Sequence, residues 1–247
     1  MNIMETLSAI PLFSELRTSD IERLASAVYE CSYAKNSVIL FKDDSVESLY
    51  VVISGQVKAV LSAEDGREVI LSLRGGGDFF GEMSLIDDGP LSMTVIATED
   101  AQLFVLHRED FKRCLQDIPQ IATGLLRSLV KRLRQADSKI SSLVLLDVSG
   151  RVAKLLIEMA DENDGINITQ RVTHHMIAQM IGSSRETVSR TIREFSEQNL
   201  VEVVRKTITM PNRRDTIAKQ RLNIIQMPYR TISIRDREAL EIIGGHV

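Results

Sequence analysis

Residues 183–197, SSRETVSRTIREFSE, constrain this chain more than any other stretch, because they have the pattern of a helix with one chemical face and one packing face. At about 100° per residue, the apolar side chains gather opposite a polar arc. Just upstream, residues 173–181 form a shorter amphipathic pattern, and Gly182 stands where a tight interhelical turn needs a residue without a Cβ. The pattern predicts a helix-turn-helix whose second helix lies in a DNA groove. The polar arc holds Arg185, Glu186, Ser189, Arg190 and Arg193, and the packing face holds Val188, Thr191, Ile192 and Phe195.

The overall composition is that of an ordinary soluble globular protein. A length of 247 residues favours about two domains, and 44% hydrophobic with 26% charged residues is enough to bury a real core. No run of about 18 apolar residues occurs, and the amino terminus lacks the basic start and long apolar block of a signal peptide. We therefore expect a cytoplasmic protein without a membrane partner.

Charge is divided unevenly along the chain. Residues 1–149 carry 15 Lys/Arg and 22 Asp/Glu, a net charge of −7, whereas residues 150–247 carry 15 and 12, a net charge of +3. The sign reverses where the predicted DNA-binding part begins, as expected if the carboxyl-terminal part meets nucleic acid.

The sequence gives little support for a metal site or a redox centre. Cys31 and Cys114 are far apart and form no CxxC motif, which argues against a disulfide framework or an iron–sulfur cluster and favours buried reduced thiols. None of the four histidines lies in the central strands, so haem is not expected, and His174 and His175 are expected to be exposed helix residues rather than metal ligands.

Between residues 28 and 106, short β-branched and apolar runs alternate with Gly, Asp and Asn at intervals near ten residues, which predicts an antiparallel jelly-roll or barrel. Within it, residues 74–97, RGGGDFFGEMSLIDDGPLSMTVIA, hold several glycines and a short helical turn. Two interpretations stay open: the segment offers backbone N–H groups to an anion, or its glycines are simply turns.

A long helical stretch follows from about residue 110 to residue 144 and is interrupted near Pro119. Its apolar residues recur at steps of three and four, like a coiled-coil seam. The stripe could cover the protein's own core, but a helix this long exceeds what a small barrel can cover, so symmetric dimerisation is favoured. The seam comprises Leu125, Leu129, Leu133, Ala136, Ile140 and Leu143.

A hinge and a further helix follow, with Asp147 as a candidate cap, and short strands flank the helix-turn-helix like the wing of a winged domain. These patterns predict an α+β protein with a sensor barrel over residues 1–115, a dimerisation helix and hinge over 116–146, and a winged helix-turn-helix domain over 147–247.

This order of parts resembles the family of the cyclic-AMP receptor protein and the fumarate–nitrate reductase regulator, which are dimeric bacterial transcription factors. The resemblance covers nearly the whole chain and rests on GDFFGEMSLIDDGP, LLDVSGRVAKLL and IGSSRETVSRTIREFSEQNLV. It implies a transcription regulator rather than an enzyme, with double-stranded DNA, a second copy of the chain and RNA polymerase as partners. No catalytic triad, metal cluster or Walker-type loop competes with this interpretation.

The predicted reader helix carries side chains suited to base edges. Arg185 and Arg190 can pair bidentately with guanine, and Glu186 can accept a hydrogen bond from cytosine, so the resemblance implies inverted TGTGA-like half-sites. Glu186 also fits a capping box with Ser183, and both roles stay open. Phosphate or solvent contacts are expected for Arg193, Ser184 and Thr187, and Ser189 lies on the same face.

The sensor segment departs from the family. Members that bind cyclic AMP hold its phosphate with an Arg, where this chain has Leu91, and meet adenine with a Thr-Ser pair, where it has Ala136 and Asp137. Loss of the guanidinium removes a charge-assisted pair, so cyclic AMP is disfavoured. The effector is instead expected to be another small molecule, such as another cyclic nucleotide or a cyclic dinucleotide, or the barrel serves only for dimerisation. The candidate effector-binding residues are Gly81, Glu82, Met83, Ser84, Ser92, Met93, Thr94, Arg132 and Asp137.

Relatives have a short wing, whereas here about 25 residues between LVEVV and the family-like ending ISIRDREALEII look inserted. Residues 205–230 carry seven Lys/Arg and a single acid, Asp215. A solvated loop is one interpretation. An extended basic wing that touches the DNA backbone or minor groove is favoured.

Overall fold

The computed structural model describes residues 3–161, 164–168, 172–210 and 225–245, with side chains described outside 204–231. The chain separates into two compact units, residues 1–137 and 138–247, which divide within one long helix, α5 (Pro119–Leu145).

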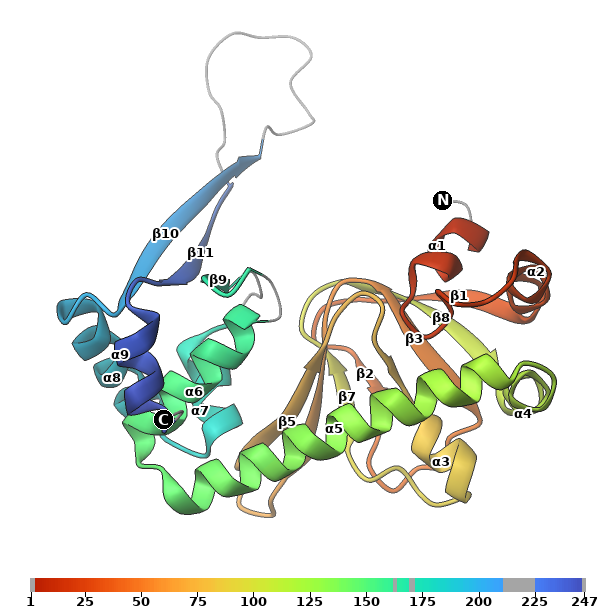
Figure 1. Cartoon of the computed structure of the whole chain (residues 1–247), viewed down its shortest axis with the longest axis horizontal. Coiled ribbons are helices and arrows are strands. Elements are labelled where there is room, and N and C mark those ends of the chain that lie inside the picture. Colours follow the sequence, from red (N-terminus) through yellow and green to blue (C-terminus); the bar gives the residue numbers. More distant parts are fainter. Residues whose placement is uncertain (1–2, 162–163, 169–171, 211–224, 246–247) are drawn as a thin grey trace, which may run out of the picture. The chain divides into compact units, whose positions relative to one another are not determined.

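The first unit is a two-layer antiparallel barrel with helices before and after it (Figure 1). One sheet has the strand order β1-β8-β3-β6 and the other β2-β7-β4-β5, so neighbours in space are far apart in sequence, as in a jelly-roll. The predicted barrel is confirmed. Its elements are α1 (Ile3–Ala9), α2 (Thr18–Ala27), β1 (Val28–Tyr33), β2 (Val38–Leu40), β3 (Ser48–Ser54), β4 (Val57–Ser62), β5 (Glu68–Arg74), β6 (Phe79–Phe80), α3 (Glu82–Asp87), β7 (Thr94–Ala97), β8 (Ala101–His107) and α4 (Arg108–Asp117).

Two apolar clusters hold this unit together. The larger joins the helices to one sheet, and includes Phe13, Phe104, Phe111 and the first turns of α5. The smaller fills the barrel interior and consists of Val52, Val57, Phe80, Val95, Ala101 and Leu103. Burial of this apolar surface is the main stabilising contribution, at roughly 25 cal/mol for each Å².

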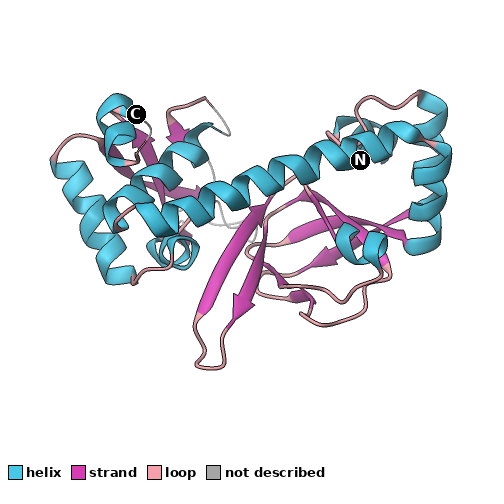
Figure 2. Ribbon diagram, turned by 60° about the horizontal axis from the view of Figure 1, so that its bottom comes forward, coloured by secondary structure: helices cyan, strands magenta, loops and turns pink. Residues whose placement is uncertain are grey.

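The second unit is a winged helix-turn-helix domain. Helix α6 (Val148–Asp161) begins where the Asp147 carboxylate accepts the Gly150 N–H at 2.7 Å, as expected of a cap. It packs against α7 (His174–Ile181), α8 (Arg185–Glu197) and α9 (Arg237–Ile243). A three-stranded sheet of order β10-β11-β9 completes the unit, with β9 (Asn167–Ile168), β10 (Val201–Met210) and β11 (Ile225–Ile234). Figure 2 shows the helices of each unit in cyan and its strands in magenta.

The wing is longer than the predicted strand at residues 200–204. Ten consecutive residues of β10 pair with ten of β11, from Val201 opposite Ile234 to Met210 opposite Ile225 (Figure 1). The two ends of the predicted insertion therefore pair with each other and form one long two-stranded ribbon. Its middle, including Arg213, Arg214, Lys219 and Arg221, lies outside the described residues.

Candidate DNA-reading surface and effector site

The turn of the helix-turn-helix fixes where α8 begins. Gly182 adopts φ 65° after α7, and the Ser183 N–H donates to the Ala178 carbonyl at 3.0 Å. Ser184 is the cap of α8, since its hydroxyl accepts the Thr187 N–H at 3.1 Å. The capping box predicted between Ser183 and Glu186 is therefore wrong: Ser183 still belongs to the end of α7, and the helix starts one residue later than that motif requires.

The two faces of α8 differ as predicted. Val188, Thr191, Ile192 and Phe195 are at most 4% exposed and pack inward. The charged side chains on the other face are exposed, and none of them forms a hydrogen bond or ion pair with another described residue. They are available to a partner, and comprise Arg185, Glu186, Arg190 and Arg193.

Ser189 lies between this surface and the preceding helix. Its hydroxyl is 2.8 Å from Nδ1 of His174, at the start of α7, and both residues are half-buried. The hydrogen bond joins the two helices of the motif. The expectation of two exposed histidines holds for His175 but is wrong for His174, because Ser189 stands one helical turn from the cap and faces α7.

The best-formed part of the predicted effector site is a buried carboxylate. Glu82, at the start of α3, is 2% exposed, and its Oε1 pairs with Nη1 of Arg132 from α5. Arg132 also donates to the Phe79 carbonyl at 2.7 Å and lies 4.4 Å above the Phe79 ring. The second oxygen, Oε2, is buried and has no hydrogen-bond partner among the described residues. A buried acceptor of this kind is costly unless a donor arrives.

The other predicted effector residues differ in burial from Glu82 and from one another. Ser84 is buried and Met93 is half-buried. Thr94 Oγ1 accepts the Lys42 N–H at 3.1 Å. Met83, Ser92 and Asp137 are exposed.

The glycines of residues 74–97 are turn formers more than anion ligands. The Gly75 N–H donates to Asp78 Oδ2 and the Gly89 N–H to Asp87 Oδ1, each at 2.9 Å, while the Gly77 N–H donates to the Val52 carbonyl at 2.8 Å. These donors are already satisfied inside the chain, which favours the turn interpretation.

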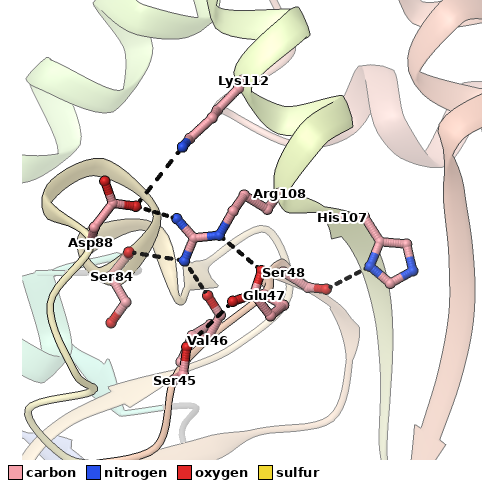
Figure 3. Close-up of polar contacts among 9 residues, drawn as sticks. All are labelled: Ser45, Val46, Glu47, Ser48, Ser84, Asp88, His107, Arg108 and Lys112. Atoms are coloured by element: carbon pink, nitrogen blue, oxygen red, sulfur yellow. Dashed lines mark hydrogen bonds and ion pairs between the residues drawn. The ribbon is translucent and has the colours of Figure 1, made fainter.

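Arg108, which the sequence did not single out, anchors the loop after α3 (Figure 3). Its Nε donates to Glu47 at 2.9 Å, its Nη1 pairs with Asp88 at 2.5 Å, and its Nη2 donates to the carbonyls of Val46 and Ser84 at 2.7 and 3.3 Å. Asp88 ends α3 with φ 55°, and Lys112 lies 3.8 Å from it. One largely buried guanidinium thus connects α4, α3 and the segment before β3.

The exposed face of α5 carries an apolar stripe. Leu126, Val130, Leu133, Ile140 and Val144 are between 49% and 76% exposed and fall on one side of the helix. The predicted seam is wrong at its beginning, because Leu125 is 3% exposed and packs in the protein's own core. The later members of the seam are exposed as predicted: Leu133, Ala136, Ile140 and Leu143.

Two family models match the chain. Residues 30–117 match the cyclic nucleotide-binding domain, and residues 150–215 match the Crp-like helix-turn-helix domain. The CRP-like cAMP-activated global transcriptional regulator of Mycobacterium tuberculosis is 30% identical over 83% of this chain and 93% of that protein. The chain belongs to the CRP/FNR family of transcription regulators.

Further relatives agree with this membership. The cyclic AMP receptor protein of Thermus thermophilus is 34% identical over 78% of this chain and 88% of that protein. The solved structure of the c-di-GMP responsive global regulator CLP of Xanthomonas campestris matches with a TM-score of 0.65 and 27% identity, covering 75% of this chain and 95% of that chain. These relatives are transcription regulators and not enzymes, and this CRP/FNR member is a DNA-binding regulator with a helix-turn-helix. Among the described helices, none is long and apolar enough to cross a membrane.

Leu91, which the resemblance sets against the arginine of members that bind cyclic AMP, is buried in this CRP/FNR member. Leu91 is 6% exposed, and its backbone pairs with Asp44 and Asp43 at 3.0 and 2.8 Å. Its side chain supplies packing where a guanidinium would supply charge. Sequence reasoning missed Arg74, at the end of β5, whose charge interacts with Glu82 and Arg132.

Gly81 offers a test of how tightly this site is built. It adopts φ 91° immediately before α3, and an added Cβ would stand 2.7 Å from the Ser48 carbonyl oxygen. We expect Gly81→Ala to lower the free energy of unfolding by about 1–3 kcal/mol, measured by urea denaturation. Gly66→Ala is the control, because Gly66 has φ 82° but open space around it, so it should cost less. Equal losses would show that only the backbone angle matters.

Proposed function

We propose that this CRP/FNR regulator binds inverted-repeat promoter sites as a homodimer, reads TGTGA-like half-sites with α8, and is gated by an effector in the sensor unit. The observation that carries the proposal is a set of exposed charges on one face of α8, Arg185, Glu186 and Arg190, which pair with no other described residue. They supply two bidentate donors and one acceptor, which match guanine and cytosine edges in the major groove.

The roles of the neighbouring residues follow from their contacts. Arg193 is exposed one turn beyond Arg190 and is suited to a phosphate. Ser184 and Thr187 stand at the amino end of α8 with their hydroxyl oxygens 3.0 Å apart, where an anion is favoured by the helix dipole. Ser189, held by His174, positions α8 on α7 instead of reading a base. The paired strands β10 and β11 support an extended wing that would add backbone contacts.

Dimerisation is supported by the apolar stripe on α5. The five side chains of this stripe, from Leu126 to Val144, are exposed along about 27 Å of helix. A second copy of the same stripe would cover it in a twofold arrangement. The two α8 helices would then meet successive major grooves, about 34 Å apart, and the bound dimer would act on RNA polymerase.

The effector is proposed to be a cyclic nucleotide or a cyclic dinucleotide. Support comes from the domain family and from relatives whose names describe activation by cyclic AMP or response to c-di-GMP. Cyclic AMP itself is disfavoured, because Leu91 is packed at the phosphate position and Asp137 stands where adenine would be met.

Selection from random double-stranded DNA tests the proposal. The full-length protein should retain inverted repeats of a TGTGA-like half-site with centres about one helical turn apart. Retention of single half-sites would contradict the homodimer, and retention of no common sequence would favour a protein that signals through protein partners.

In a second candidate function, the protein binds the same DNA sites but no effector controls the binding. The burial of Leu91 favours this function, since the barrel would then serve only for dimerisation. Binding to the selected DNA that is equally strong with and without each candidate nucleotide in a gel-shift assay would establish this constitutive form.

A further inference from the structure

Arg74 belongs to the interior of the barrel and not to its outer surface. It is paired directly with Val57 across strands β4 and β5, and directly opposed residues in an antiparallel pair place their side chains on the same face. Val57 is fully buried in the inner apolar cluster with Phe80 and Val95. The Arg74 side chain therefore starts on the inner face, at the end of the strand nearest to Gly75 and β6.

A second guanidinium, that of Arg74, lies near the ion pair of Arg132 with the buried carboxylate of Glu82. Arg132 reaches the site from α5 and pairs with Glu82, and Arg74 interacts electrostatically with both. Asp78 is also near Arg74 but is exposed and accepts the Gly75 N–H. Burial and the adjacent Arg132 lower the pKa of Arg74 to about 10, so it stays charged at neutral pH.

The polar groups of this cluster are incompletely paired. Arg132 has both Glu82 and the Phe79 carbonyl, whereas Arg74 has no hydrogen bond or ion pair within the described part of the chain. Glu82 Oε2 is buried and likewise has no partner in the parts of the chain that the structure describes. A guanidinium that needs an acceptor and a carboxylate oxygen that needs a donor thus lie in one cluster.

We propose that Arg74 is an effector-binding residue that takes over, from strand β5, the anion-binding role that Leu91 cannot perform. The ligand is an organic oxyanion whose phosphate or carboxylate pairs with Arg74. A hydroxyl of the same ligand donates to Glu82 Oε2, the contact that the family resemblance already implies for this glutamate. The apolar walls nearby, including the stacked Tyr50 and Phe80 rings at 5.1 Å, would pack against the ligand's uncharged part. This inference rests on the proposed gating of the sensor unit.

The test is a thermal-shift titration of the full-length protein without DNA. The probes are cyclic AMP, cyclic GMP and cyclic di-GMP as phosphate anions, gluconate as a carboxylate anion, and adenosine, guanosine and glucose as neutral counterparts. We expect at least one oxyanion to raise the Tm while its neutral counterpart does not, because only binding to the folded state stabilises it. The responding arm identifies the phosphate or the carboxylate source.

Arg74→Gln should weaken binding of that probe by about 10- to 100-fold, as expected for the loss of a charge-assisted hydrogen bond. Arg74→Lys should keep part of the affinity, because it keeps the charge without the fork. Arg67→Gln, on the same hairpin but exposed and paired only with Asp65 among described residues, is the matched control and should leave the affinity unchanged.

The same variants separate a binding role from a structural one. Without ligand, Arg74→Gln should leave the Tm unchanged or raise it, because it removes an unpaired cation beside Arg132. A fall of several degrees, an unchanged affinity, or a panel in which no oxyanion exceeds its neutral counterpart would overturn the proposal. The affinity for the selected DNA is measured separately, with and without the probe. If a probe binds through Arg74 but leaves the DNA affinity unchanged, the proposed gating is wrong while the proposed binding site stands.

Discussion

Replacing Arg190 with Ala should remove discrimination at one base position of each half-site. A bidentate arginine–guanine pair contributes about 1–3 kcal/mol of discrimination, and a dimer presents it twice. We therefore expect the affinity for the selected site to fall by about 2–6 kcal/mol in total. Arg190 is exposed on α8 and its side chain makes no hydrogen bond or ion pair with another described residue, so its removal should leave folding intact. Fluorescence anisotropy against the selected site and its single-base variants measures the change.

Arg193→Ala is the matched control on the same helix. A phosphate contact carries no sequence information, so this variant should weaken binding to all sequences alike and reduce the salt dependence by about one counterion for each contact. If Arg190→Ala behaves in the same uniform way, Arg190 contacts the backbone and the proposed direct readout is wrong.

The double variant Leu133→Asp with Ile140→Asp should be monomeric. Both side chains are more than 60% exposed on the stripe of α5, and burying each in a dimer is worth about 1.5 kcal/mol or more. Four such side chains in a dimer give about 6 kcal/mol, which corresponds to roughly four orders of magnitude in the dissociation constant. Sedimentation equilibrium should then give the monomer mass of 27.7 kDa. The affinity for the inverted repeat should also fall, because the two α8 helices are no longer linked in one dimer.

Gln135→Asp provides the comparison, since Gln135 is exposed on the side of α5 opposite the stripe. It introduces the same carboxylate into the same helix and should leave the mass of the dimer unchanged. A double variant that remains dimeric would show that another surface joins the two copies.

Local periodicity carried much of the prediction. The helix-turn-helix follows from the alternation of charged and apolar residues over 183–197 together with Gly182, and the structure confirms both faces of α8. The barrel follows from short strands at regular spacing, and the predicted break near Pro119 separates α4 from α5. Such features depend on residues that are close in sequence, so a single sequence contains the information that sets them.

The sequence pattern did not correctly predict features that depend on contacts between residues far apart in the chain. The pairing of β4 with β5 shifts register between Ala59 and Val60. Because this irregularity breaks the simple alternation of inward and outward side chains, the sequence pattern does not predict that Arg74 shares the inner face with Val57. Leu125 fits an ideal coiled-coil seam, but packing against the helices before the barrel takes it into the core.

The sequence by itself determined the family, the order of the parts and the charged side chains offered to DNA, because these lie in contiguous motifs. Only the tertiary structure decided that Ser184 caps α8, that Ser189 faces His174, and that one buried oxygen of Glu82 finds no partner among the described residues. The physical reason is that capping, burial and pairing depend on the angle at which one element meets another, and packing over the whole domain sets that angle.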